Sequence, residues 1–189
     1  MNLSNIKDLV IRLSKDYKVN PINVCLLDDY KSNQSSIILI LSEKDSKQGH
    51  YVLYLQNTNP PLYFDPYGKY PSQLFLKYPK TMYNEEKLYQ LFNDLLQDPT
   101  IVVNTNKIQT TSSLCGPLCL IFYIVYCKVE DIKIISNLLK KFKEIYKVSV
   151  EDYINTLINN NNHDIYYSIK KVITNLLNIY NHIKTIKKL

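Results

Sequence analysis

A cysteine at the start of a long apolar run is the feature of this sequence with the clearest chemical potential. Cys115 is followed by Gly116 and Pro117, and residues 118–127 are almost wholly apolar. If a helix begins near Gly116, the thiol lies at its N-terminus, where Pro is tolerated because its missing N–H would be unpaired anyway. The helix dipole and the unpaired N–H groups there favour the thiolate, which can act as a nucleophile. We expect Gly116 to let a substrate backbone approach closely.

An imidazole and a carboxylate upstream could serve this thiol as base and orienting acid. His50 opens a strand-like run, and a hairpin turning between residues 57 and 58 would set it opposite Asp65. Directly opposed residues have Cβ atoms about 5 Å apart, so Asp65 could accept the imidazole N–H and stabilise the imidazolium. Pro60 or Pro61 would shift this register by causing a bulge.

Gln109 is predicted to end a strand six residues before Cys115. Its amide can donate a hydrogen bond to an oxyanion, with the Cys115 backbone N–H as a second donor. One such donor contributes about 2.7–4 kcal/mol of transition-state stabilisation. A Gln at a strand end means little alone, and only its spacing to Cys115 gives it weight. A cysteine hydrolase needs a nucleophile, a base, a group that orients the base and an oxyanion donor. The candidates for these roles are Cys115, His50, Asp65 and Gln109.

The other cysteines and histidines are interpreted as structural or solvated. Most free cysteines are buried structural residues. We assign Cys25, Cys119 and Cys127 to this structural class. The C-x3-C spacing of Cys115 and Cys119, with no second pair of ligands, argues against zinc. His163, in an Asn-rich stretch, and His182 are expected at the surface. We expect no metal or organic cofactor.

Hydrophobic periodicity predicts the elements that must position these residues. Helices are expected at 4–17, 84–97, 117–128, roughly 130–146, 149–158 and 164–186, and strands at 36–42, 50–56, 62–65 and 100–108, with a loop at Asn159–Asn162. This order indicates an α+β domain whose central mixed β-sheet is packed by helices, with a buried nucleophile helix.

Composition and charge limit the remaining choices. The chain has 189 residues, 46% of them hydrophobic, which predicts a single domain over 1–189 that we expect to be a monomer. Its four cysteines and the absence of a secretory leader point to a reducing compartment. The longest apolar run, at about 14 residues, is short of the roughly 20 that span a membrane, so no membrane contact is expected.

The positive charge is concentrated in the last third of the chain. Residues 1–127 hold 12 basic and 11 acidic residues, whereas residues 128–189 hold 11 lysines and 6 acidic residues, a net charge of +5. Two interpretations carry equal weight: contact with nucleic acid or an acidic partner, and a solvated helical face.

These residues resemble those of the adenovirus-type (adenain-like) maturation cysteine proteases, which are related to the ubiquitin-like-protein proteases. The likeness covers most of the chain, up to residues 162–169, and is carried by the order His, Asp, Gln, Cys and by Gly49-His50-Tyr51, Phe64-Asp65-Pro66-Tyr67-Gly68, Gln109 and Cys115-Gly116. It implies that His50 is the general base, that Asp65 orients it, that Gln109 builds the oxyanion hole and that Cys115 attacks the carbonyl. It also implies an adenain/ubiquitin-like-protease type of cysteine protease fold.

The resemblance further implies a substrate and a setting. Family members cleave viral capsid or core precursor proteins after glycine in small-residue sites during virion maturation, because the groove beside the thiol is narrow. The expected locations are the virion and the host-cell cytoplasm (viral factory), and the bias toward Lys, Asn, Ile and Tyr suits a virophage or polinton-like element. The adenoviral enzymes use DNA as a cofactor, which is compatible with the basic C-terminal third.

This sequence departs from the family at two points, and two other functions stay open. Tyr51 stands where Trp is frequent in the family. The sequence has no cysteine between Asp65 and Cys115 that could bind the activating peptide of the adenoviral enzymes through a disulfide.

One alternative function is that of a protease that removes ubiquitin or a ubiquitin-like modifier. The other is a catalytically inert nucleic-acid-binding module, for which all four cysteines would alkylate at equal rates.

Overall fold

The computed structural model describes residues 3–32, 34–41, 49–73, 85–96, 100–104, 106–110, 113–161 and 164–186. The chain divides into two compact units, one formed by residues 1–11 and 21–119 and the other by residues 12–20 and 120–189. The division falls inside helix α1 (Leu3–Tyr17) and helix α4 (Cys115–Val129), which contribute residues to both units. All four predicted site residues belong to the first unit.

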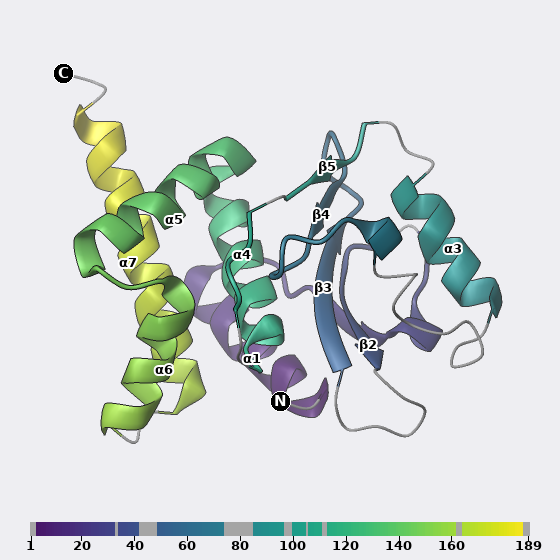
Figure 1. Cartoon of the computed structure of the whole chain (residues 1–189), viewed down its shortest axis with the longest axis horizontal. Helices are drawn as coiled ribbons and strands as arrows, with labels where there is room; N and C mark the ends of the chain where they lie inside the picture. Colours follow the sequence, from purple (N-terminus) through teal and green to yellow (C-terminus); the bar gives the residue numbers. More distant parts are fainter. Residues whose placement is uncertain are drawn as a thin grey trace. The chain divides into compact units, whose positions relative to one another are not determined.

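The first unit contains a five-stranded mixed sheet with the order β1-β2-β3-β4-β5 (Figure 1). Its strands are β1 (Asn23–Leu26), β2 (Ser36–Leu41), β3 (Gly49–Leu55), β4 (Leu62–Phe64) and β5 (Val102–Val103). The central strand β3 is antiparallel to its neighbours β2 and β4, and β1 and β5 join the two edges in parallel to β2 and β4. The predicted α+β class with a mixed sheet is therefore confirmed.

Helix α3 (Glu85–Leu96) covers one face of this sheet (Figure 1). Its apolar residues recur at helical spacing, and Leu88, Leu91 and Leu95 pack in one cluster with sheet residues that include Val52 and Tyr54. Each buried aliphatic side chain of this size contributes about 1.5–3 kcal/mol relative to exposure. The packed sheet gives β3, the strand that carries His50, a rigid base.

The second unit contains helices α5 (Ile132–Tyr146), α6 (Val150–Asn161) and α7 (Ile165–Ile186), which pack on one another. Asp131 begins α5 by accepting hydrogen bonds from the backbone N–H groups of Lys133 and Ile134. The hydroxyl of Tyr17, at the end of α1, donates to the Lys170 carbonyl of α7 at 2.7 Å. None of the helices in the described ranges combines the length and apolarity that a membrane crossing requires.

Two element predictions are wrong in part, and one strand is absent from the predictions. The expected strand at 100–108 is limited to Val102–Val103, because β5 pairs only with β4, a strand of three residues. The expected Asn159–Asn162 loop is helical up to Asn161, so tertiary context overrides the weak helix propensity of Asn. Strand β1 was not predicted, since four residues show no clear period. Residues 162 and 163, and with them His163, lie outside the described residues.

The register of the β3–β4 hairpin also differs from the prediction. Tyr54 pairs with Tyr63 and Leu55 with Leu62, which places position 65 opposite Val52 rather than opposite His50. The prolines at 60 and 61 cannot donate ladder hydrogen bonds, so the connection extends to residue 61. The shift amounts to two residues, and a two-residue shift keeps every side chain on its face. Asp65 therefore remains on the side of His50, as its diagonal neighbour.

Candidate active site

Cys115 is the first residue of α4, as predicted, and is 6% exposed. The first hydrogen bond of this helix runs from the Leu118 N–H to the Leu114 carbonyl at 2.9 Å, so Pro117 costs the helix no bond. The sulfur accepts hydrogen bonds from the backbone of Gly116 and of Tyr51. These donors surround the place where a thiolate would carry its charge.

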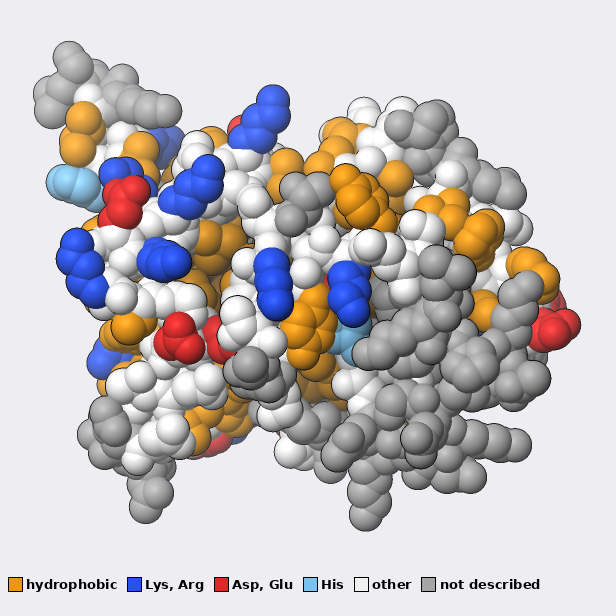
Figure 2. All heavy atoms as spheres, viewed as in Figure 1, with side chains coloured by type: hydrophobic (Ala, Val, Ile, Leu, Met, Phe, Trp, Pro, Cys, Tyr) orange, Lys and Arg blue, Asp and Glu red, His pale blue; other side chains and the backbone are white. Residues whose placement is uncertain are grey.

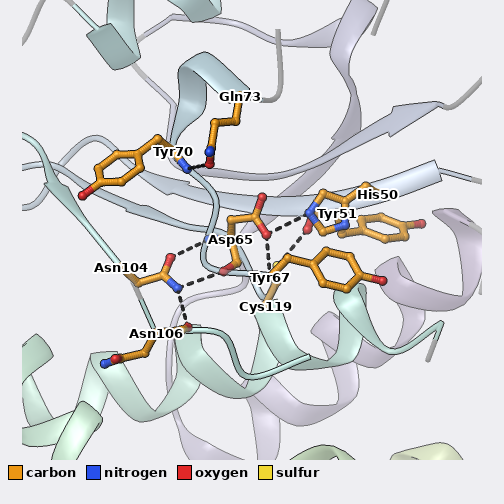
Figure 3. A network of polar contacts seen from close by, with 9 residues as sticks. All are labelled: His50, Tyr51, Asp65, Tyr67, Tyr70, Gln73, Asn104, Asn106 and Cys119. Atoms are coloured by element: carbon orange, nitrogen blue, oxygen red, sulfur yellow. Dashed lines mark hydrogen bonds and ion pairs between the residues drawn. The ribbon is translucent and has the colours of Figure 1, made fainter. Parts of the chain in front are cut away.

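His50 lies between the thiol and the buried carboxylate of Asp65. Its Nε2 atom is 3.1 Å from Asp65 Oδ1, and its ring also hydrogen-bonds to Cys115. The N–H of Nε2 falls outside strict hydrogen-bond geometry toward the carboxylate, but the attraction between the charges depends mainly on the distance. Because Nε2 faces Asp65 (Figure 3), Nδ1 is the nitrogen left for the sulfur.

The thiol and the imidazole shift each other's pKa in opposite directions. Burial alone would raise the pKa of the Cys115 thiol, but hydrogen bonds from His50 and the backbone, together with the His50 charge, hold it below its usual value. Burial alone would lower the pKa of His50, but the interactions of its ring with the Asp65 carboxylate and with Cys115 raise it to about 9. The arrangement thus favours a thiolate–imidazolium pair near neutral pH.

A tight turn presents the Asp65 carboxylate. The Tyr67 N–H donates to Asp65 Oδ1 at 2.7 Å, and the Gly68 N–H donates to the Asp65 carbonyl at 2.8 Å. Asp, Pro and Gly at the first, second and fourth positions are the residues that a type I turn prefers, and the Asp side chain adds an Asx turn. Gly68 has a φ of 68°, a left-handed conformation that glycine adopts easily. The Asp-Pro-Tyr-Gly sequence therefore fixes the position of the acid.

Gln109 lies beside this turn but not at a strand end, which corrects the prediction. The N–H groups of Ile108 and Gln109 both donate to the Pro66 carbonyl at 2.9 Å. Gln109 is fully buried. The chain leaves β5 at Val103, and an irregular segment rather than a long strand brings the backbone of Gln109 to the Asp65–Gly68 turn.

The predicted role of Gly116 is also wrong. A Cβ atom at this position would lie 2.6 Å from Ile6 Cδ1 and 3.1 Å from Tyr51 Cδ2. The space beside Gly116 is therefore filled by side chains of α1 and β3 and not left for a substrate. Glycine here permits α4 to pack closely, which brings Cys115 to the strand that carries His50.

Two residues with no predicted role contact the acid or the base. The Tyr67 ring packs on His50 with centroids 5.0 Å apart, and Lys69 Nζ lies 5.7 Å from the same Tyr67 ring. Asn104, directly after β5, hydrogen-bonds with both backbone groups of Asp65 (Figure 3). The one sequence signal at this position is a polar residue directly after the Ile-Val-Val run, and no role is predicted for it.

The remaining cysteines differ from Cys115 in electrostatics. Burial raises the pKa of Cys25 to about 11, raises the pKa of Cys127, and raises the pKa of fully buried Cys119 well above its usual value. The Cys119 thiol, one helical turn after Cys115, donates to the Tyr51 carbonyl at 3.5 Å. His182 is exposed, as predicted. Of the four thiols, Cys115 alone is shifted toward the thiolate.

Comparison with known proteins adds no family to this description. A scan against protein-family models gives no match, and a search of curated proteins gives none either. The fold and the site define an α+β protein in which a cysteine at a helix N-terminus meets a histidine oriented by an aspartate. Such an arrangement can carry out nucleophilic acyl transfer.

Proposed function

We propose that this protein is a cysteine endopeptidase with Cys115 as nucleophile, His50 as acid and base, and Asp65 as the group that orients His50. The observation that most supports this function is the position of the His50 ring, which contacts the thiol and the carboxylate together. The order sulfur, imidazole, carboxylate is that of catalytic triads on unrelated folds.

The proposed reaction begins with attack of the Cys115 thiolate on the scissile carbonyl carbon. The oxyanion that forms accepts hydrogen bonds from the Cys115 backbone N–H and the Gln109 amide. The His50 imidazolium gives its proton to the leaving amine, and the C–N bond breaks to leave a thioester. Neutral His50 then takes a proton from water, and the hydroxide attacks the thioester. Release of the acid product restores the thiolate and the imidazolium.

The substrate class is proposed from the sequence resemblance together with the burial of the site. Cys115 and His50 are only 6% and 7% exposed, which favours a residue without a side chain before the scissile bond. We therefore expect cleavage after glycine in small-residue sites. The resemblance to adenain-like enzymes makes viral capsid or core precursors, cut during virion maturation, the proposed substrates.

We also propose contact between the second unit and nucleic acid. Lys133 and Lys140 are exposed and seven residues apart on α5, so they lie along one side of the helix. Lys147, also exposed, follows directly as the C-cap residue of α5, and we call these three residues the lysine row. Lys and Arg side chains are visible over this helix in Figure 2. A row of lysines is suited to the regular phosphates of a nucleic acid backbone.

The test of endopeptidase activity is digestion of a peptide library and a capsid-type precursor by the wild type and by Cys115→Ala and Cys127→Ala proteins. We expect cleavage after glycine by the wild type and the Cys127 variant and none by the Cys115 variant. Mass spectrometry of the products identifies the cleaved bond. Equal turnover by the Cys115 variant would refute the proposal.

A second measurement separates the enzyme from an inert binding module. Iodoacetamide at neutral pH should alkylate Cys115 far faster than Cys25, Cys119 or Cys127, with each site followed by peptide mapping. Equal rates at all four thiols would favour the inert module. Turnover of a Gly-Gly-terminated modifier conjugate without turnover of the precursor would move the assignment to a protease for ubiquitin-like modifiers.

A further inference from the structure

Asn104 holds the backbone of Asp65 at two points. The Asp65 N–H donates to Asn104 Oδ1 at 2.7 Å, and Asn104 Nδ2 donates to the Asp65 carbonyl at 2.8 Å. Nδ2 also donates to the Asn106 carbonyl at 3.2 Å. Asn104 is 8% exposed, and its own N–H donates to the Tyr63 carbonyl of β4 at 3.2 Å. Figure 3 shows the amide facing the Asp65 backbone, on the opposite side from His50.

We infer that Asn104 is a positioning residue that joins Asp65 and the segment carrying Gln109 into one rigid part of the active site. This inference rests on the proposed endopeptidase function. The side-chain hydrogen bonds of Asn104 go to the backbone of Asp65 and Asn106, so its effect on the thiol passes through Asp65.

Of the side chains considered for position 104, only a short primary amide can bind both the N–H and the carbonyl of Asp65. Asp65 leaves β4 without ladder partners for its N–H and carbonyl, because β5 has already ended at Val103. An amide side chain offers one acceptor and two donors in one plane and so reaches both groups at once. Asp lacks the donors and Leu lacks both functions. With Leu, the Asp65 carbonyl would still accept from the Gly68 N–H, but the buried Asp65 N–H would lose its acceptor, which would pull the turn toward water.

The same segment continues to Gln109. After Asn104 and Asn106, the N–H groups of Ile108 and Gln109 bind the Pro66 carbonyl, next to Asp65. The acid turn and the Gln109 segment are therefore held to each other at both ends, by the Asn104 amide and by the Pro66 carbonyl. Loss of the Asn104 amide would therefore weaken the contact between Asp65 and His50, while the helix that carries Cys115 would be unchanged.

The experiment measures how the rate of Cys115 alkylation by iodoacetamide depends on pH, in the wild type, Asn104→Leu and Asn104→Gln proteins. This readout needs no substrate. If Asn104 holds Asp65 against His50, the positive charge on His50 should be less stable in the Leu variant. The Cys115 thiolate would then be less stabilised, and the pH midpoint of alkylation should rise by about one unit. The Gln variant retains the amide and should recover part of the shift. Circular dichroism confirms that each variant is folded at the temperature used.

Asn23→Leu provides a matched control, because Asn23 Nδ2 also bridges two strands of the sheet by donating to Ser36 Oγ at 3.0 Å. This variant should lose stability without any change in the Cys115 midpoint. An unchanged midpoint in folded Asn104→Leu, or an equal shift in Asn23→Leu, would overturn the inference alone. A wild-type Cys115 with the midpoint of an ordinary thiol would instead overturn the proposed function and this inference with it.

Discussion

The proposed chemistry depends on His50, because both of its partners favour the positively charged form of its ring. Asp65 and Cys115 together raise its pKa to about 9, while His50 in turn holds the pKa of Cys115 below its usual value. The reactive form needs an ionised sulfur and a protonated ring. It is therefore present above the lowered pKa of Cys115 and below about pH 9, where His50 loses its proton.

This order of pKa values predicts a bell-shaped dependence of kcat/KM on pH. Activity should rise as Cys115 ionises and fall near pH 9 as His50 becomes neutral. Steady-state cleavage of a glycine-containing peptide between about pH 4 and 10 gives the profile. An activity that keeps rising above pH 9, as for an ordinary thiol, would contradict the ion pair.

Asp65→Asn removes the negative charge beside His50 while keeping the size of the side chain. The pKa of His50 should fall, and the alkaline limb of the pH profile should move to lower pH. We expect kcat to fall by less than the roughly 10⁴-fold loss seen for this change in a serine triad, because the cysteine nucleophile is already ionised. Steady-state kinetics and a thermal melt separate this loss from unfolding. A wild-type profile in the variant would remove Asp65 from the mechanism.

The four candidate site residues could be found from sequence because their types and order have chemical meaning. Cys115, His50 and Asp65 are brought together, and the Asp-Pro-Tyr-Gly turn explains how the acid is presented. Asn104 could not be found in the same way, because its role is to bind two backbone groups that lose their ladder partners only where the neighbouring strands end. That condition depends on tertiary structure, and a polar residue after the Ile-Val-Val run does not by itself reveal it.

At the scale of elements, α4 is positioned by a contact that the sequence does not reveal. The apolar run correctly predicts a buried helix, but the need for glycine at position 116 comes from Ile6, more than 100 residues away in the chain. The hairpin register was missed for a similar reason: the alternation of side chains fixes the face, whereas the length of the connection fixes the pairing. Because the error was an even number of residues, His50 and Asp65 still share a side.

Gly116→Ala should destabilise the protein despite the higher helix propensity of alanine. The new methyl group would overlap Ile6 and Tyr51, and overpacking of this kind costs about 1–3 kcal/mol, against a gain of about 1 kcal/mol from propensity. Urea denaturation gives the difference in the free energy of unfolding.

A double-mutant cycle identifies the cause of that destabilisation. In an Ile6→Ala background the methyl group of Gly116→Ala has room, so the second substitution should be neutral or stabilising. If Gly116→Ala lowered the free energy of unfolding equally in both backgrounds, Ile6 would not be the side chain that the new methyl group overlaps.

At the scale of the molecule, the charge is distributed unevenly between stretches of the chain. Residues 128–189 carry 11 of the 23 basic residues against 6 acidic residues, and they include the exposed lysine row of α5 and its C-cap. Not every lysine there is available, since Lys141 pairs with Glu144 at 2.6 Å and Lys170 with Asp16 at 2.7 Å. Among the residues that the structure describes, the row of Lys133, Lys140 and Lys147 has no acidic partner within ion-pair distance.

Binding of duplex DNA should therefore be weak at high salt and should depend on this row. Replacement of Lys133, Lys140 and Lys147 by Glu should lower the affinity and reduce the slope of log K against log salt by about 0.9 for each phosphate that is no longer neutralised. Fluorescence anisotropy at several salt concentrations measures both quantities. Lys31→Glu, an exposed change in the first unit, is the control. Affinity that does not vary with salt would exclude this mode of binding.

The hydrogen bond between Tyr17 and α7 has a consequence for biosynthesis. The hydrogen bond from the Tyr17 hydroxyl to the Lys170 carbonyl joins residues 153 positions apart. A ribosome therefore delivers α1 long before its partner exists, and the nascent chain must keep that helix soluble while the intervening sheet and helices emerge. The second unit cannot close during most of translation, so a co-translational protease digest should find the segment around Tyr17 cleavable until α7 has left the exit tunnel.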